Sequence, residues 1–427
     1  MKNRFVAIAL AALLLSASIW THADSRDLTI ASPAEVGMDK KGLAELGKSM
    51  RDLVDNGELS AVTTAVSRHG KLVHWQAYGY QDTEKATPLR DDSIFRIYSM
   101  TKPIVGVALM TLWEEGRFKL SDPVEKYIPE LAGLAVAKAD GPDGKPITEP
   151  ADHAITIREL VSHTGGLSYG FFSRSQTDTL YLQAQLLNRD NTLKEFVTRL
   201  GKLPLKTQPG STWEYSVSVD VQGYLIEVLA GKPLDLVLKE RVFEPLGMPD
   251  TDFWVTPEKA ARLTTIYSPG QDGKLVARPI GEYLTKPTFF SGGGGLASTA
   301  MDYLRFGQML ANEGELDGVR ILKPATIEMM HTNQMPDSID YINRFVGTPG
   351  NTFGIDFAIV EDPDGTTDHL KAKSEFWWYG IGGTWFGVNP VQDLVIVGMI
   401  QNQGGPGARK ARIDGKQLVY AAIRDSE

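Results

Sequence analysis

Ser99-Met100-Thr101-Lys102 runs directly into the apolar stretch Pro103-Ile104-Val105-Gly106-Val107-Ala108-Leu109-Met110. On a helix, positions i and i+3 share a face, so the Lys102 amine can reach the Ser99 hydroxyl. A serine hydroxyl is a weak nucleophile until a base takes its proton, and a lysine is that base only where its surroundings favour the neutral amine. A helix that is apolar all round is buried, and burial favours the neutral amine. The stretch therefore predicts a nucleophile, a base and a buried helix that tunes the base.

The residue after this motif indicates where Ser99 lies in the fold. Pro103 lacks an N–H and fits the first turn of a helix, which places Ser99 at or just before the helix N-terminus. Free backbone N–H groups and the positive end of the helix dipole lie there, and both suit a developing oxyanion. A bare Ser-x-x-Lys motif occurs by chance about once in a chain of this length. A capping serine followed by a solvated lysine stays open as the alternative.

The N-terminus is typical of a secretory signal peptide. Lys2 and Arg4 form a basic segment, and residues 5–15 form an apolar core that is too short to span a bilayer. The segment ending at Ala23 offers a small-residue cleavage site. We therefore expect residues 1–23 to be removed and the mature chain to be exported, either to the periplasm or fully secreted. An uncleaved membrane anchor is the alternative, and no later apolar run reaches membrane-spanning length.

The composition excludes several classes of function. The 427 residues include no cysteine, which excludes disulfides, thiol catalysis and cysteine-bound metals. The formal net charge is −9 and no basic stripe stands out, so we expect no nucleic-acid partner. The seven histidines form no His-Glu-x-x-His motif, and we expect neither a metal nor another cofactor.

Strand and helix patterns are distributed unevenly along the chain. We expect strands at 61–65, 72–78, 353–359, 383–388 and 394–400, and helices at 39–55, 219–230, 302–312 and 415–424. Strands thus occur near both ends, with mainly helices between them. This order predicts an α/β (α+β) fold with a sheet domain built from residues 24–115 and 285–427 and an inserted, mostly helical domain at 116–284. The site would lie in the cleft between them, a common place for ligand pockets.

Two further segments are candidates for the site. Tyr215 stands on a loop just before the helix at 219–230, where a phenol could relay protons. The aromatic run at 376–379 leads into a glycine-rich segment, and glycine lets a backbone approach a ligand closely. A strand there would offer an N–H to an oxyanion. A half-buried structural tyrosine and an aromatic core patch are the alternatives.

Five segments follow one another in a characteristic order. They are Phe95 to Ile104 around the serine; Leu160-Val161-Ser162-His163-Thr164-Gly165-Gly166-Leu167; Tyr215-Ser216-Val217; the glycine run from Ser291 to Tyr303; and Trp378-Tyr379-Gly380. This ordered set resembles the serine β-lactamase and penicillin-binding-protein superfamily, on its class C side. The resemblance covers most of the chain. It implies a β-lactamase/transpeptidase-like fold, in which an antiparallel sheet is flanked by helices and carries the inserted helical domain.

The resemblance also implies roles for single residues. Ser99 would be the nucleophile, with Lys102 and Tyr215 as the proton-transfer pair. The backbone N–H groups of Ser99 and Ile381 would form the oxyanion hole. The residues expected to contact the substrate are Val217, Trp378, Tyr379 and Gly380.

Two departures from the family pattern bear on the substrate. Val217 replaces the asparagine that holds a β-lactam side-chain amide, and Trp378 replaces the lysine that recognises the β-lactam carboxylate. Trp-x-Gly at this place is similar to the family VIII carboxylesterases. The resemblance therefore implies a serine hydrolase that forms an acyl-enzyme and acts on short-acyl esters.

Other readings stay open beside this one. An amide-bond hydrolase would act on aminohexanoate oligomers or D-peptides, or as a weak β-lactamase, and a non-catalytic penicillin-binding-like sensor would use the same cleft. Gly166-Leu167-Ser168-Tyr169-Gly170 matches the Gly-x-Ser-x-Gly nucleophile elbow, which needs a strand before it and a helix after it. Here the motif follows a capped helix, so we interpret Ser168 as structural.

Overall fold

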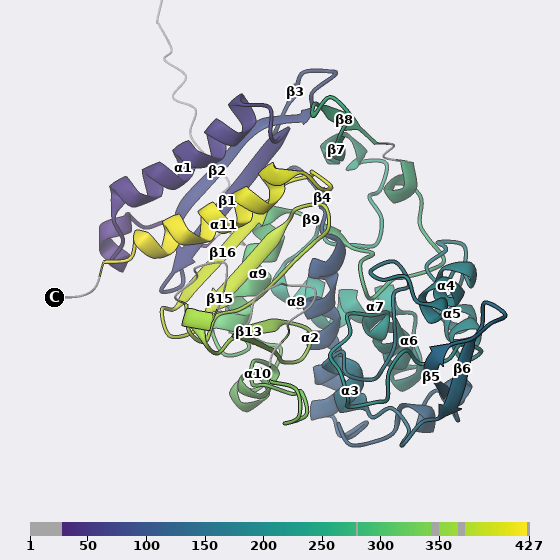
Figure 1. Cartoon of the computed structure of the whole chain (residues 1–427). Helices are drawn as coiled ribbons and strands as arrows, with labels where there is room; N and C mark the ends of the chain where they lie inside the picture. Colours follow the sequence, from purple (N-terminus) through teal and green to yellow (C-terminus); the bar gives the residue numbers. More distant parts are fainter. Residues whose placement is uncertain (1–27, 279–280, 341, 343–349, 366–371, 425–427) are drawn as a thin grey trace, which may run out of the picture.

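Both ends of the chain supply strands to one antiparallel sheet. The structure is a computed structural model that describes residues 28–278, 281–340, 342, 350–365 and 372–424. The strand order of the sheet is β12-β13-β14-β15-β16-β1-β2-β3 (Figure 1). The strands are β1 (Ala61–Arg68), β2 (Lys71–Asp82), β3 (Thr87–Pro88), β12 (Asn351–Phe353), β13 (Ala358–Val360), β14 (Phe376–Tyr379), β15 (Trp385–Asn389) and β16 (Leu394–Met399). This arrangement confirms the α/β fold class that the sequence predicts.

The central strand β1 is buried on both faces. It pairs with β16 on one side and β2 on the other, and all eight of its residues are buried. Val62 and Val66 point into the core between the sheet and the terminal helices, whereas Ala65 belongs to the larger core on the opposite face. The period of two along a strand places alternate residues on opposite faces. Two helical layers therefore share this one sheet.

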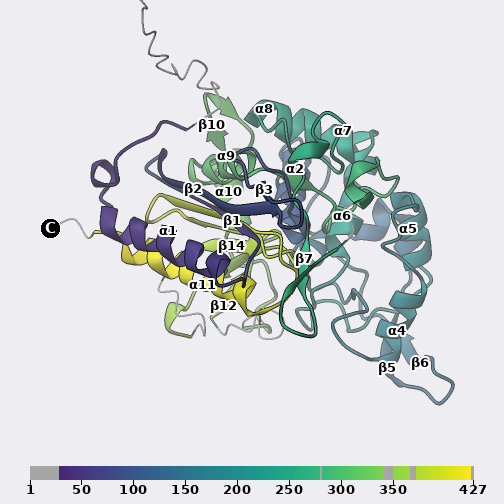
Figure 2. The same cartoon turned by 90° about the horizontal axis from the view of Figure 1, so that it is seen from above.

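Helices from the two ends of the chain cover one face of the sheet. α1 (Lys40–Asp55) and α11 (Pro406–Ala421) lie side by side there, and α9 (Ala300–Ala311) covers the other face (Figures 1 and 2). The Asp39 side chain caps α1 by accepting from the Gly42 N–H, which satisfies a donor left free at the helix start. Leu46 and Met50 of α1 are fully buried against the sheet. This is the amphipathic pattern expected of a helix with one solvated face.

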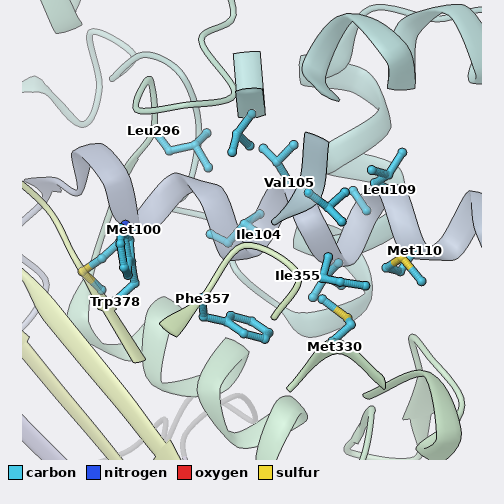
Figure 3. Close-up of a cluster of buried hydrophobic side chains, with 14 of the residues drawn as sticks. Met100, Ile104, Val105, Leu109, Met110, Leu296, Met330, Ile355, Phe357 and Trp378 are labelled. Carbon is cyan, nitrogen blue, oxygen red and sulfur yellow. The ribbon is translucent and has the colours of Figure 1, made fainter. Parts of the chain in front are cut away.

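The helix that follows Ser99 is buried along most of its length. α2 (Thr101–Glu114) begins after the short 3-10 turn η2 (Tyr98–Met100), and Thr101 to Met110 are all buried. Ile104, Val105 and Leu109 pack there with Leu296, Met330, Ile355 and Phe357 from later segments (Figure 3). The prediction of a buried helix after Ser99 is confirmed.

Along the chain, helices and small two-stranded ribbons lie between the N-terminal strands and the C-terminal strands of the sheet. The helices are α3 (Ile157–Val161), α4 (Gln176–Gln183), α5 (Leu193–Leu200), α6 (Ser218–Ala230), α7 (Leu234–Leu238), the π-helical segment η5 (Lys239–Phe243), α8 (Glu244–Leu246) and, nearer the C-terminus, α10 (Pro324–Met330). The two-residue and longer ribbons are β4 (Phe95–Arg96) with β9 (Ala297–Ser298), β5 (Ala135–Asp140) with β6 (Pro146–Pro150), β7 (Tyr267–Pro269) with β8 (Leu275–Ala277), and β10 (Glu315–Leu316) with β11 (Val319–Arg320). Short 3-10 turns lie at Pro33–Val36, Val124–Lys126, Pro129–Leu131, Ala260–Arg262, Gly281–Leu284 and Pro363–Gly365.

Two predicted elements differ from those observed. The strand expected at 353–359 is a hairpin, β12 and β13, because Asp356 has a positive φ of 64° and turns the chain. The last helix begins at Pro406 rather than near residue 415, since proline suits the first turn of a helix. The helix expected at 219–230 is confirmed, with Gly231 in the left-handed conformation at its end.

Residues 1–23, the predicted signal peptide, lie outside the described residues. Within the ranges that are described, no helix combines the length and the apolar character needed to cross a bilayer.

Candidate active site

Three side chains from two distant segments meet at the start of α2. The Lys102 Nζ lies 3.3 Å from the Ser99 Oγ, and the Tyr215 hydroxyl donates to the same Oγ at 2.8 Å. Ser99 lies in the 3-10 turn η2, and Lys102 follows it by one turn on α2. Tyr215 comes from the loop that leads into α6. The structure thus brings together the three residues that the sequence singled out as nucleophile and proton-transfer pair.

The backbone before Ser99 has an uncommon conformation. Tyr98 has a φ of 44°, a region that non-glycine residues rarely occupy. Such residues occur where the surrounding structure holds a side chain in a functional position. Gly380 packs directly against this turn, because a Cβ at Gly380 would lie 2.3 Å from the Ile97 carbonyl oxygen. The end of β14 therefore lies close beside the serine turn only because residue 380 is glycine.

Lys102 is fully buried, and among the described residues no carboxylate forms an ion pair with it. Its Nζ donates to the Gly293 carbonyl at 2.5 Å and lies 4.6 Å from the centre of the Tyr215 ring. Burial lowers the pKa of Lys102 from 10.5 to about 7, and the charge of Asp220 and, more weakly, that of Asp356 oppose this shift. A substantial neutral fraction of the amine is therefore present at neutral pH.

Asp220 anchors Gly293, the residue whose carbonyl accepts a hydrogen bond from Lys102. Its Oδ1 accepts from the Ser291 hydroxyl at 2.6 Å and from the Gly293 N–H at 3.0 Å, and its Oδ2 has no partner within the described residues. Burial raises the pKa of Asp220, and hydrogen bonds from Ser291 and the charge of Lys102 oppose that rise. Asp220 thus anchors the backbone N–H of Gly293, the residue whose carbonyl oxygen accepts from the amine.

A second buried carboxyl group, Asp356, packs against α2. A Cβ at Gly106, one turn beyond Lys102, would lie 2.7 Å from the Asp356 Oδ2. Asp356 Oδ1 accepts from the Gln222 amide at 3.0 Å, and burial raises the pKa of Asp356 to about 8. Asp356 is therefore mainly neutral at pH 7, and it contributes little negative charge beside the lysine.

Aromatic rings hold Tyr215 in place. The Trp378 indole N–H donates to the Tyr215 hydroxyl at 3.4 Å, and the rings of His163 and Tyr169 lie 4.9 Å and 5.2 Å from the Tyr215 ring. Burial raises the pKa of Tyr215 well above 10. The phenol therefore keeps its proton at neutral pH, while Lys102 is the group that can accept one.

A cavity of about 300 Å³ opens in front of Ser99. Its described lining residues include eight aromatic side chains: Tyr98, Tyr169, Phe171, Phe172, Tyr215, Tyr283, Phe289 and Tyr379. Ser99 and Ile381 both line it, and within the described part of the chain neither of their backbone N–H groups donates to another protein atom. These two donors are therefore available to a ligand in the cavity.

Comparison with known proteins adds the family to this geometry. A family model described as Beta-lactamase matches residues 46–421. The chain belongs to this family. Its members include enzymes, and the protein is a serine hydrolase of the Beta-lactamase family.

Two curated relatives and one solved structure illustrate the match. The chain is 37% identical over 361 residues to Protein Rv1367c of Mycobacterium tuberculosis, which covers 83% of this chain and 88% of that protein. It is 31% identical over 382 residues to Esterase EstB of Burkholderia gladioli, covering 83% and 89%. The structure of EstCE1, a hydrolase with promiscuous acyltransferase activity, matches with a TM-score of 0.76 at 24% identity, covering 89% of this chain and 99% of that one, and this likeness shows the shared fold.

Of the four residues expected to contact a substrate, one lines the cavity and three do not. Tyr379 lines the cavity, whereas Trp378 is buried behind it and contacts Tyr215. Val217 is also buried, where it joins the hydrophobic core at the start of α6, and it does not line the cavity. Gly380 does not line the cavity either, because it packs on Ile97. A large hydrophobic side chain at 217 is drawn into the core, where an asparagine would need polar partners.

Ser168, the serine of the Gly-x-Ser-x-Gly motif, lies outside the site. Ser168 is buried, and its hydroxyl donates to Asp178 at 2.6 Å and accepts from the Gly170 N–H. It does not line the cavity. Among the described residues, no three His, Asp or Glu side chains form a group that could hold a metal ion.

Sequence reasoning missed Asp220, Asp356 and Gly293. An aspartate in the mainly apolar segment 219–226 was a visible signal for Asp220, since a buried charge requires a partner. Asp356 carried no such signal, because the strand expected at 353–359 does not indicate on which face of the sheet its side chain lies.

Proposed function

We propose that the protein is a carboxylesterase that acts on short-acyl esters through an acyl-enzyme on Ser99. The observation that carries this proposal is the contact of the Ser99 hydroxyl with a buried lysine of lowered pKa and with a neutral phenol. The 31% identity to Esterase EstB supports ester hydrolysis rather than another reaction of the family.

In the proposed mechanism, Lys102 takes the proton as Ser99 attacks. The Ser99 Oγ forms a bond to the ester carbonyl carbon, and the neutral Lys102 amine accepts the hydroxyl proton. When the bond to the leaving alcohol breaks, the Tyr215 hydroxyl protonates the alcohol oxygen and is reprotonated from the lysine. A water molecule then attacks the acyl-enzyme by the same route in reverse, releasing the acid and restoring Ser99.

The backbone N–H groups of Ser99 and Ile381 would stabilise the tetrahedral oxyanion. Both residues line the cavity, and neither N–H is used within the described part of the chain. Losing one such donor typically costs ~10²–10³-fold in kcat. The amine, the phenol and the two N–H groups would together supply all the functions that acyl transfer to serine requires.

Trp378 argues for esters against β-lactams. A β-lactam presents a carboxylate beside its reactive ring, and binding it requires a cation or several donors. Trp378 is buried, and its N–H already faces Tyr215. Arg305 is held by the Leu246 carbonyl and by Asp317, and neither it nor Lys373 lines the cavity. Among the described lining residues the one cation is Arg189, and it does not stand at the position where the lactamases carry their lysine. A carboxylate left unpaired here raises the free energy of the transition state, and each ~1.36 kcal/mol of that increase lowers the rate about tenfold.

The test compares kcat/KM for p-nitrophenyl butyrate and nitrocefin on one preparation. We expect the ester to be preferred by at least ~100-fold, which corresponds to ~2.7 kcal/mol. Ser99→Ala should abolish turnover, and a fluorophosphonate should label the peptide that contains Ser99. Ser168→Ala is the matched control and should still be labelled. Equal or faster nitrocefin turnover would contradict the esterase proposal.

Two alternatives are outcomes of the same experiment. Faster turnover of small amides or D-peptides than of esters would make the protein an amide-bond hydrolase. A folded protein that reacts with neither the probe nor any substrate would be a non-catalytic sensor. The presence of Ser99, Lys102 and Tyr215 in mutual contact speaks against that reading.

We further propose that the enzyme is exported after cleavage near Ala23 and that residues 116–284 form a helical domain inserted into the sheet domain of residues 24–115 and 285–427. The basic and apolar segments of the N-terminus support export. Mass spectrometry of protein from the native host should find a mature N-terminus at or near Asp24. An intact Met1 on cytoplasmic protein would contradict it.

A further inference from the structure

The cavity in front of Ser99 has one cationic side chain among its described lining residues, Arg189. Arg189 lies on the loop between α4 and α5 and is half-buried. One guanidinium nitrogen, Nη2, donates to the Glu282 carbonyl at 2.5 Å, and the group lies 5.2 Å from the centre of the Tyr283 ring. A guanidinium has five N–H donors, and no carboxylate within the described ranges forms an ion pair with this one.

The loop that carries Arg189 is fixed to the cavity wall. The Arg189 carbonyl accepts from the Phe289 N–H at 3.2 Å and from the Thr288 hydroxyl at 3.0 Å. Together with the bond to Glu282, these contacts join the loop to both ends of the segment 282–289. Phe289, Tyr283 and Glu282 from that segment line the cavity beside Arg189. The guanidinium is therefore held in position before any ligand arrives, which reduces the entropy lost on binding.

A second cation lies behind the same wall. The buried Arg96 guanidinium lies 5.2 Å from the centre of the Tyr283 ring, as Arg189 does. Glu282 is the one carboxylate among the described lining residues, and it is exposed. Two guanidinium groups thus flank Tyr283, opposed by a single solvated carboxylate. The other described lining residues are uncharged, so an anion in the cavity would find its complementary charge at Arg189.

We propose, on the basis of the esterase function above, that Arg189 binds a carboxylate carried by the substrate. The natural substrate would then be an ester with a free carboxylate at a distance from its reactive carbonyl. A guanidinium matches a carboxylate with two parallel N–H···O bonds, which a lysine cannot form. Trp378, at the position where the lactamases carry their lysine, is buried and does not line the cavity, whereas Arg189 does.

The experiment uses matched pairs of esters that differ by one carboxylate. Monophenyl adipate and phenyl hexanoate share their acyl-chain length, so they test a carboxylate on the acyl side. 3-Acetoxybenzoate and phenyl acetate test a carboxylate on the alcohol side. For each pair, the ratio of kcat/KM for the anionic ester to that for the neutral ester cancels changes in folding or in the amount of active enzyme.

We expect Arg189→Gln to lower this ratio by about 10- to 100-fold for at least one pair, the size of a charge-assisted hydrogen bond. Arg189→Lys should retain part of the preference, because it keeps the charge and loses the planar fork. Lys286→Gln is the control, since Lys286 lies in the same wall segment, pairs with Asp235 and does not line the cavity. It should leave the ratio unchanged.

Two results would overturn the proposal: an unchanged ratio for both pairs in Arg189→Gln, or an equal fall in Lys286→Gln. Failure of the esterase function would look different, because wild-type protein would then turn over neither neutral ester in a Ser99-dependent way. In that case, calorimetry decides the subsite without catalysis. Monophenyl adipate or 3-acetoxybenzoate should bind Ser99→Ala about 10- to 100-fold more tightly than Ser99→Ala/Arg189→Gln, and equal dissociation constants would refute the role of Arg189.

Discussion

Lys102 and Lys416 are both fully buried, yet their surroundings differ in one decisive respect. Lys416, on α11, forms an ion pair with the buried carboxylate of Glu375 and lies 4.6 Å from the centre of the Trp377 ring. Lys102 forms no such pair within the described residues and donates instead to the Gly293 carbonyl and the Ser99 hydroxyl.

The difference shows that burial alone does not make a lysine a base. A contacting carboxylate stabilises the ammonium form and keeps the proton on the amine. Around Lys102, the nearby acids Asp220 and Asp356 are kept out of contact, and burial raises the pKa of both. We therefore expect the lysine of α11 to be structural and the lysine of α2 to be the base.

The largest expected effect comes from Lys102→Met. Loss of the general base should lower kcat for p-nitrophenyl butyrate by ~10²–10⁴-fold. The folded protein should nevertheless become more stable at pH 7. Because the pKa of Lys102 falls to about 7 in the folded state, the unfolded chain binds more protons between pH 7 and 10.5, and the wild type gains stability as the pH rises through that window. Urea denaturation at pH 7 and at pH 10.5 measures the free energy of unfolding of the wild type and of the variant. A variant less stable than the wild type at pH 7 would contradict the prediction.

Lys416→Met should have the opposite effect on stability. It leaves the buried carboxylate of Glu375 with the Tyr420 hydroxyl but without its cation, and breaking a buried ion pair in this way typically costs ~3–5 kcal/mol. Denaturation midpoints in urea measure the loss, and the double variant Lys416→Met/Glu375→Gln should recover part of it. The pH dependence of kcat/KM should keep the wild-type midpoint. A displaced midpoint would show that the two lysines are coupled, and the comparison would fail.

The dependence of kcat/KM on pH measures the pKa of Lys102 in the folded enzyme. Activity should fall about tenfold per pH unit below a midpoint near pH 7, as the amine is protonated. Asp220→Asn keeps the side-chain acceptor and removes a charge that raises the pKa of Lys102, so the midpoint should move to lower pH. Asp356→Asn is the matched control. Asp356 is mainly neutral below its pKa of about 8, and asparagine tolerates its positive φ, so this variant should move the midpoint less. An equal or larger shift in Asp356→Asn would contradict this assignment.

The smallest expected effect is that of Trp378→Phe. It removes the indole N–H that reaches the Tyr215 hydroxyl at 3.4 Å and keeps an aromatic ring in the buried position behind the cavity. A single hydrogen bond contributes ~0.5–1.5 kcal/mol, so kcat should fall by about two- to tenfold with KM little changed. A large rise in KM would instead indicate that Trp378 contacts the substrate directly.

The sequence predicted those parts of the site that are close together along the chain. The spacing of Ser99 and Lys102 and the apolar run after them were enough to predict a buried amine beside a hydroxyl, because both are properties of one helix. The role proposed for Tyr215 needed the family resemblance, since nothing local tells a reactive tyrosine from a structural one. The structure brings it to 2.8 Å from Ser99.

The parts that could not be predicted depend on contacts between distant segments. Asp356 reaches α2 only because the segment 353–359 forms a tight hairpin, and Val217 lies in the core rather than in the cavity. Arg189 gave no signal, because its position depends on hydrogen bonds to Glu282 and Phe289 about a hundred residues later. Spacing patterns report on one element at a time, so they carry no information on such packing.

The pairing of β1 with β16 also has a consequence for how the molecule is made. Thr63 lies opposite Met399, so the central ladder of the sheet joins two segments more than 300 residues apart. Contacts of such high sequence separation form slowly, because a long loop must close before they are gained. During synthesis the hairpin of β1 and β2 therefore lacks its neighbour until residues 394–399 have left the ribosome. The serine turn itself packs against Gly380 and pairs through β4 with residues of β9, so the chain acquires its reactive centre only near the end of translation.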